Sequence, residues 1–313
     1  MGGENEEGEM MLVQRISGIY ERISKLGSLS PSEEVDGLFT ELVHLCIPVV
    51  AIEVCELSPE VQAMRTKLIK LCGEAEGLLE CHYSDLLASF DNPLDHLELF
   101  PYYNNYVKLS QLEYTLLARH APAPARVAFV GSGPLPLSSI VLAARHVPAS
   151  AQIDNYDVDA AANERARRLV RGDGGVPGGA RLEFHTADVM DVTLALRGYD
   201  VVFLAALVGV EREEKARVVE HLARHMAPGA VLVARSAHGA RAFLYPVVDP
   251  AEDLKGFEVL TVHHPADEVI NSVIVARKPT HGGVHPPAPA VLRPCKRCGM
   301  VQGFHHLGHE SII

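Results

Sequence analysis

Apolar residues in the first third of the chain recur at the spacing of α-helices. From Met10 to Lys25 they lie three or four residues apart, which places them on one face of a helix. Two later segments, Ser30-Pro31 and Ser58-Pro59, carry the signal of a helix start, with serine as N-cap and proline at the first helical position. The second pair opens a long predicted helix that reaches about Ser89.

A proline-rich stretch, Ala121 to Pro124, ends the helical pattern and reads as a short stiff linker. The segment before it, Tyr102 to His120, completes the series of predicted helices. We therefore expect an α-helical domain over residues 10–120, preceded by a disordered acidic tail over residues 1–9.

After the linker the apolar pattern changes to short buried runs that alternate with amphipathic stretches. These runs predict strands at 126–130, 152–156, 181–186, 200–206, 230–235, 257–263 and 272–276. The repeated strand–helix order implies an α/β fold with a mainly parallel sheet, and the last two strands, which have no helix between them, suggest an antiparallel edge. We expect a Rossmann-like domain over residues 125–278 and a disordered tail, rich in His and Pro, over residues 279–313.

A glycine turn, Gly131-Ser132-Gly133, follows the first of these strands. Its glycines permit positive φ and let a ligand approach the backbone. The third glycine of a dinucleotide motif is replaced by Pro136, and Pro134 lacks an N–H that a pyrophosphate would use. The turn therefore disfavours NAD and suits S-adenosylmethionine better, although an ordinary strand–helix turn explains the glycines equally well.

Acidic residues follow the next two predicted strands. Asp157 and Asp159 come after the second strand, where a carboxylate can hold the hydroxyls of a ribose, and Asp188 follows the third, where an adenine amino group can be read. Each of these aspartates, taken singly, can be explained as an ordinary solvent-exposed loop residue. Together, and beside the glycine turn, they favour an adenosine site.

The helical part contains a second group of candidate residues. Glu76 and Glu80 are four residues apart on one helix face, where like charges repel mildly, and Tyr106 belongs to a tyrosine-rich segment, 100–106. A carboxylate can hold or deprotonate an amine, and aromatic faces suit a sulfonium. Without further evidence, these glutamates are equally well explained as solvent-exposed surface residues and the tyrosines as core residues.

Composition narrows the possible functions. The 313 residues are 48% hydrophobic and 22% charged, and the net charge of −12 argues against nonspecific nucleic-acid binding. The longest apolar run, Val201 to Val210, is about half of the roughly 20 residues that a membrane span requires, so we expect no transmembrane segment. The acidic N-terminus lacks a secretory signal, and the six cysteines read as reduced thiols, so we expect a cytoplasmic protein.

Two further patterns carry weaker signals. Cys295 and Cys298, with nearby histidines, have zinc-ligand spacing, but no second cysteine pair accompanies them, and we expect no metal site. The segment Tyr106 to Leu109 and the pair Leu116-Leu117 match vesicle-sorting patterns, but their place in a predicted helix favours buried packing. Vesicle association stays an open alternative.

The longer motifs carry a resemblance to a known family. The sequence resembles plant nicotianamine synthases over nearly its whole length, and its His- and Pro-containing tail resembles the variable end of the grass members. The motifs that carry the resemblance are Ala75-Glu76-Gly77-Leu78-Leu79-Glu80, Leu99-Phe100-Pro101-Tyr102-Tyr103-Asn104-Asn105-Tyr106, Phe129-Val130-Gly131-Ser132-Gly133-Pro134-Leu135-Pro136 and Asn155-Tyr156-Asp157-Val158-Asp159.

The resemblance implies a methyltransferase-like Rossmann domain under an N-terminal α-helical domain. It also implies that three S-adenosylmethionine molecules are joined by aminocarboxypropyl transfer into nicotianamine, with three methylthioadenosines released. Nicotianamine chelates iron and other transition metals and is a phytosiderophore precursor in grasses. By motif position, Glu80 and Tyr106 handle the reacting amine, with Glu76 as a competing candidate. S-adenosylmethionine is the substrate, and no metal or other cofactor is expected, because the sulfonium already activates the carbon.

Two other functions remain as alternatives. An ordinary methyltransferase would release S-adenosylhomocysteine in place of methylthioadenosine. A metal-binding or trafficking protein would act through the C-terminal cysteines and histidines. The sequence leaves the oligomeric state undetermined.

Overall fold

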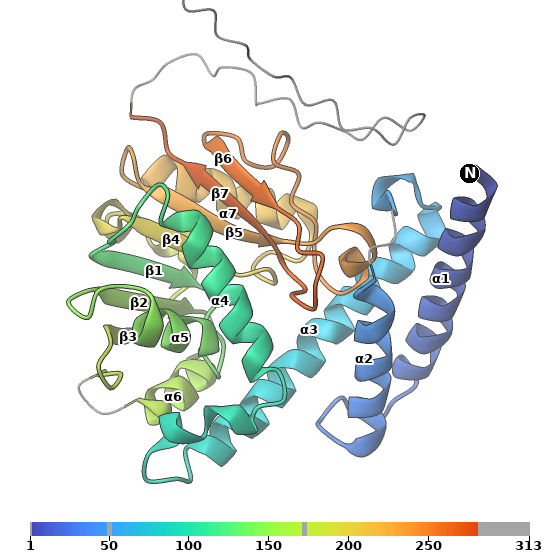
Figure 1. The fold of residues 1–313 in the computed structure, drawn as a ribbon, viewed down its shortest axis with the longest axis horizontal. Helices are drawn as coiled ribbons and strands as arrows, with labels where there is room; N and C mark the ends of the chain where they lie inside the picture. Colours follow the sequence, from blue (N-terminus) through green and yellow to red (C-terminus); the bar gives the residue numbers. More distant parts are fainter. Residues whose placement is uncertain (1, 49–51, 171–173, 281–313) are drawn as a thin grey trace, which may run out of the picture. The chain divides into compact units, whose positions relative to one another are not determined.

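The helical pattern of the first third of the sequence folds into long helices joined by short 3-10 turns. The computed structural model describes residues 2–48, 52–170 and 174–280, all of which belong to one compact unit. In chain order the elements are α1 (Gly2–Ile23), α2 (Glu33–Cys46), η1 (Val54–Glu56), α3 (Pro59–Leu87), η2 (Pro93–Leu99) and α4 (Tyr103–Leu117) (Figure 1).

Helix starts depend on which side chain caps the free N–H groups. Ser58 caps α3 as predicted, since its Oγ accepts a hydrogen bond from Val61 N and Pro59 follows it. The start of α2 differs from the prediction: Ser32, not Ser30, is the N-cap, with Oγ accepting from Val35 N at 3.3 Å. The acidic residues that follow Ser32 then fall in the first helical turn, where the helix dipole stabilises negative charge.

The first helix starts earlier than its apolar pattern predicts. α1 begins at Gly2, so that residues 2–9 are helical where a disordered acidic tail was expected. Glutamate is a good helix former, and a segment rich in it extends a helix that apolar packing has already nucleated. The predicted tail from residue 279, including the cysteines and histidines of residues 295–309, lies beyond residue 280 and so outside the described residues.

The second part of the chain forms a mixed seven-stranded sheet in the order β3-β2-β1-β4-β5-β7-β6. The strands lie within a few residues of their predicted positions, and β7 is antiparallel to both β5 and β6, which confirms the expected antiparallel edge. The strands are β1 (Arg126–Val130), β2 (Gln152–Asp157), β3 (Arg181–Thr186), β4 (Val201–Leu204), β5 (Val231–Ser236), β6 (Glu258–His263) and β7 (Ser272–Arg277). The order reverses between β1 and β4, and ligands of such sheets bind at that reversal.

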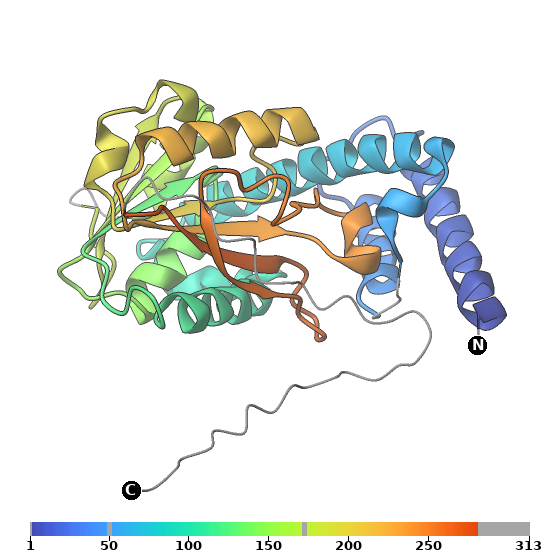
Figure 2. The same cartoon turned by 90° about the horizontal axis from the view of Figure 1, so that it is seen from above.

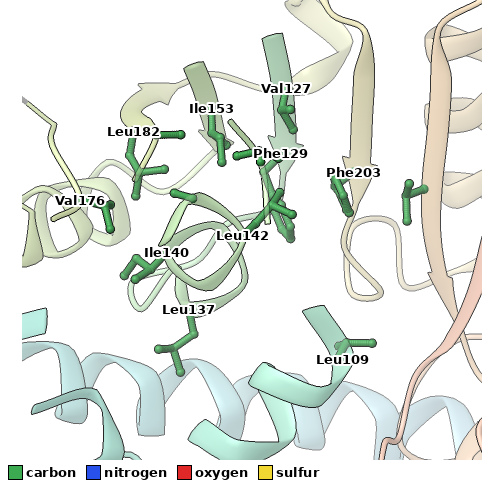
Figure 3. Packing of buried hydrophobic residues seen from close by; sticks show 14 of the residues in the cluster. Leu109, Val127, Phe129, Leu137, Ile140, Leu142, Ile153, Val176, Leu182 and Phe203 are labelled. Carbon is green, nitrogen blue, oxygen red and sulfur yellow. The ribbon is translucent and has the colours of Figure 1, made fainter. Parts of the chain in front are cut away.

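Helices cover both faces of the sheet, as Figure 2 shows. On one face, α5 (Leu137–Arg145) packs Ile140 and Leu142 against Val127 and Phe129 of β1, together with α4 and α6 (Ala160–Leu169) (Figure 3). Burial on both faces explains why the central strands β1, β4 and β5 consist largely of continuous apolar runs.

The opposite face is covered by α7 (Arg212–His225). Its residues Val219 and Leu222 pack with Val202 of β4 and Leu232 of β5. A third hydrophobic cluster contains Ile16 of α1, Leu42 of α2 and Leu68 of α3, and it also includes Phe243. Phe243 belongs to η5 (Gly239–Phe243), which follows β5, so this cluster fastens the N-terminal helices to the sheet. No helix in the described part of the chain is long and apolar enough to cross a bilayer.

Candidate active site

A cavity of about 670 Å³ lies where α3 and α4 meet the carboxyl ends of the parallel strands. This volume is within the range of small-molecule sites. From the helical part it is lined by Glu76, Glu80 and Tyr106, and from the sheet by the glycine turn and the residues that follow β2, β3 and β4. The structure thus brings together two groups of predicted residues that are far apart in the sequence.

The glycine turn forms the floor of the cavity. Gly131 and Gly133 have φ values of 80° and 69°, as expected for a turn that passes close to a ligand. A Cβ atom at position 133 would lie 2.7 Å from Glu80 Oε2, so the absence of a side chain there leaves space for this carboxylate. Ser132 also lines the cavity, and its Oγ has no hydrogen-bond partner among the described residues.

The strand-end acids divide into two kinds. Asp157 lines the cavity, and its Oδ2 accepts a hydrogen bond from Gly133 N at 2.9 Å. Asp188 also lines it. Asp159 does not, because the chain turns there into α6 and its carboxylate caps that helix by accepting from Ala161 N at 2.8 Å. The structure therefore places one of the two candidate ribose-binding aspartates at the cavity and the other at a helix end.

The two glutamates share one tyrosine. Tyr106 Oη lies 3.1 Å from Glu76 Oε1 and 3.2 Å from Glu80 Oε1. A second phenol, Tyr245, donates to Glu76 Oε2 at 2.9 Å. The sequence reading did not find Tyr245, since it stands alone after β5 with no motif around it.

Burial governs the protonation of this cluster. Burial, and then the charge of Glu76, raise the pKa of Glu80 well above its usual value. Burial also raises the pKa of Glu76, while hydrogen bonds from Tyr245 and Tyr106 act in the opposite direction. Burial and the nearby carboxylates raise the pKa of Tyr106 well above the usual value, so this phenol keeps its proton. The cluster is therefore built to hold a proton between two carboxylates.

A buried arginine completes this wall of the cavity. Arg235, at the end of β5, is paired in two hydrogen bonds with Glu113 of α4, at 2.7 and 3.0 Å. Its Nη2 also donates to Ser138 Oγ at 2.7 Å, and its guanidinium lies over the ring of Phe129. The sequence reading missed this pair too, because neither residue stands in a motif.

Lys215 of α7 supports the loop after β4. Its Nζ donates to the carbonyl oxygens of Ala205 and Ala206, at 3.2 and 2.8 Å, and both alanines line the cavity. Burial lowers the pKa of Lys215 to about 7.

This lysine predicts a pH-dependent stability. Between about pH 7 and 10 the folded protein has released the Lys215 proton and the unfolded chain has kept it, so stability rises with pH in this window. Relative to Lys215→Met, the free energy of unfolding of the wild type should rise by up to about 1.4 kcal/mol per pH unit. Denaturant titrations of both proteins at several pH values measure this. A constant difference across the window would contradict it.

One group in the described part of the chain has metal-ligand spacing. Asp154, Glu183 and His185 place their ligand atoms within 4.8 Å of one another. None of them lines the cavity, and Asp154 already accepts hydrogen bonds from Tyr199 and Gln152. The group is therefore explained by internal hydrogen bonding on the sheet.

The tyrosine-based sorting pattern is packed inside the fold. Tyr106 lies in the cavity wall with its hydroxyl on the two glutamates, and Leu109 is buried. Leu116 and Leu117 are buried as well. These segments are not presented to a sorting partner in this fold.

Comparison with known sequences gives the family context. The family profile described as "Nicotianamine synthase protein" matches residues 4–282. The chain is 64% identical to nicotianamine synthase 9 of Hordeum vulgare, over 94% of this chain and 91% of that protein. It is 61% identical to nicotianamine synthase 3 of Oryza sativa subsp. indica, over 96% of this chain and 91% of that one.

Solved structures show the same architecture. The crystal structure of MtNAS in complex with MTA and tNA matches with a TM-score of 0.72 at 22% identity, over 85% of this chain and 97% of that chain. A mutant of MtNAS in complex with S-adenosylmethionine matches with a TM-score of 0.71 at the same identity. These similarities support the fold.

Proposed function

We propose how the site works from one premise: the chain belongs to the nicotianamine synthase family. It condenses three S-adenosylmethionine molecules into nicotianamine by aminocarboxypropyl transfer and releases three methylthioadenosines. The product is a chelator of iron and other transition metals and a precursor of phytosiderophores. The roles of individual residues in this reaction are the proposal.

The donor S-adenosylmethionine is assigned to the glycine turn. Asp157 binds the ribose hydroxyls through the carboxylate that already accepts from Gly133 N, and Asp188 reads the adenine. The methionine part passes over Gly131 and Gly133, which line the cavity together with Ser132. Asp159 takes no part, because it does not line the cavity, whereas Asp157 and Asp188 do.

The choice between the two glutamates is supported by their free oxygen atoms. Each oxygen of Glu76 accepts from a phenol, Tyr106 at one and Tyr245 at the other. Glu80 Oε2 accepts from no described residue and lies beside Gly133, where the donor is assigned. We therefore assign amine deprotonation to Glu80, and the position of its Oε2 is the observation that carries this assignment.

Tyr106 is proposed to connect the two carboxylates. A phenol has one proton to donate, so its contacts with Glu76 and Glu80 are both hydrogen bonds only when one carboxyl is itself protonated. In the reactive state that proton lies on Glu76 and Glu80 is ionised. Burial and the charge of Glu76 raise the pKa of Glu80, so its carboxylate is a strong base for the proton of an α-ammonium group.

The transfer itself balances without a further reagent. The acceptor ammonium gives one proton to Glu80, and its nitrogen lone pair attacks the γ-carbon of the donor. The carbon–sulfur bond breaks, and its electron pair neutralises the sulfonium, which leaves as methylthioadenosine. We propose that no resident metal or cofactor takes part, because the sulfonium supplies the activation.

Incubation with S-adenosylmethionine alone tests this function. We expect nicotianamine and methylthioadenosine by mass spectrometry, at the same initial rate with and without excess EDTA. S-adenosylhomocysteine as the by-product would identify a methyltransferase instead. A rate that EDTA abolishes and Zn²⁺ or Mg²⁺ restores would show that a metal is required.

We also propose that the protein works in the cytoplasm. Cys46, Cys72 and Cys81 are free thiols, and burial raises the pKa of Cys46 to about 12, as expected of inert reduced cysteines. Recovery of the protein in a membrane or secreted fraction would contradict this location.

A further inference from the structure

Arg235 has donors that the protein itself does not use. Three of its five N–H groups are engaged, by Glu113 and Ser138. The two on Nη1 have no partner among the described residues, although the residue is 8% exposed and lines the cavity. A buried cation with free donors at a cavity wall is suited to an anionic group of a ligand.

Glu113 determines what Arg235 can bind. It holds the guanidinium in a bidentate pair, and among the described residues no ion pair joins Arg235 to Glu76 or Glu80. Burial lowers the pKa of Arg235, but Glu113 outweighs this effect, and the net shift is upward. The guanidinium therefore stays charged, and the amine-handling carboxylates stay free of it.

The sheet order places Arg235 away from the adenosine side. β2 and β3, which carry Asp157 and Asp188, lie on one side of β1, and β5, which carries Arg235, lies on the other. On the side of β5 the cavity is also lined by Tyr245, which is bonded to Glu76. An amino acid whose amine is at Glu80 carries its carboxylate on the same carbon, and Arg235 is a cation that lines the same cavity as Glu80.

We propose that the Nη1 edge of Arg235 binds the α-carboxylate of the amino acid whose amine attacks the donor. This inference rests on the proposed function and extends it: Glu80 receives the amine, and Arg235 fixes the carboxylate beside it. Two fixed groups on one carbon orient the lone pair of the amine toward the γ-carbon of the donor. Arg235 is thus a substrate-binding residue for the acceptor.

Two probes separate this role from a structural one. Methylthioadenosine has no carboxylate and nicotianamine has three, so only nicotianamine binding depends on a carboxylate-binding residue. Calorimetry measures the affinity of the free protein for methylthioadenosine and the affinity of the methylthioadenosine-saturated protein for nicotianamine. Arg235→Lys should weaken nicotianamine binding about 10-fold or more and leave methylthioadenosine binding within about two-fold. The matched control is Arg241→Lys, another buried arginine, which donates only to backbone carbonyls and does not line the cavity.

The control should bind both probes like the wild type. Equal weakening of both probes by Arg235→Lys, or of neither, would overturn the proposal. If that variant does not fold, the double variant Arg235→Gln with Glu113→Gln removes both charges and is expected to lose nicotianamine binding selectively; unchanged nicotianamine binding would again overturn it. Wild-type protein that binds neither probe would instead contradict the proposed function.

Discussion

Glu80→Gln is expected to lower the rate of nicotianamine formation about 10²–10⁴-fold, the usual contribution of a general base. The amide has nearly the same size, so it fits beside Gly133, where Glu80 Oε2 now lies. It cannot take a proton from the α-ammonium, which therefore stays without a lone pair. Initial rates of methylthioadenosine release at saturating S-adenosylmethionine measure the loss.

Glu76→Gln is the matched comparison for this result. Both oxygens of Glu76 are engaged by the phenols of Tyr106 and Tyr245, so Glu76→Gln should lower the rate of nicotianamine formation only about 10-fold, less than Glu80→Gln. Methylthioadenosine should bind to both variants like the wild type. If Glu76→Gln lowered the rate more than Glu80→Gln, amine deprotonation would be assigned to Glu76. If Glu80→Gln kept the wild-type rate, Glu80 would have no role in the mechanism.

Asp157→Asn should weaken methylthioadenosine binding about 100-fold, which corresponds to charge-assisted hydrogen bonds of about 1.5–3 kcal/mol each. The substitution removes a carboxylate that accepts a hydrogen bond from Gly133 N and that is proposed to bind the ribose hydroxyls. An asparagine amide presents only one acceptor oxygen to these donors. Calorimetric titration with methylthioadenosine measures the change.

The neighbouring aspartate provides the control. Asp159→Asn keeps a good N-cap for α6, since Asn and Asp are nearly equivalent there, and should leave nucleoside affinity within about two-fold. The assignment of the ribose to Asp157 would be wrong if Asp159→Asn weakened binding as much as Asp157→Asn.

Local patterns in the sequence were sufficient for most of the fold. Strands buried on both faces must be short apolar runs, and helices packed on one face must repeat their apolar residues every three or four positions. The strand–helix order and the antiparallel edge therefore followed from the sequence. The start of α2 did not follow in the same way, because Ser30 and Ser32 both precede acidic residues, and the structure shows that Ser32 is the N-cap.

The sequence by itself also determined the glycine turn and the residue types around it, because positive φ and a close ligand approach both require glycine. The tertiary structure decided which polar residues meet. It separated Asp157 from Asp159 and left an oxygen of Glu80 free by binding both oxygens of Glu76. It also paired Arg235 with Glu113 across 122 residues of sequence. Periodicity reports only a residue's own helix or strand, whereas such pairings depend on how distant elements pack together.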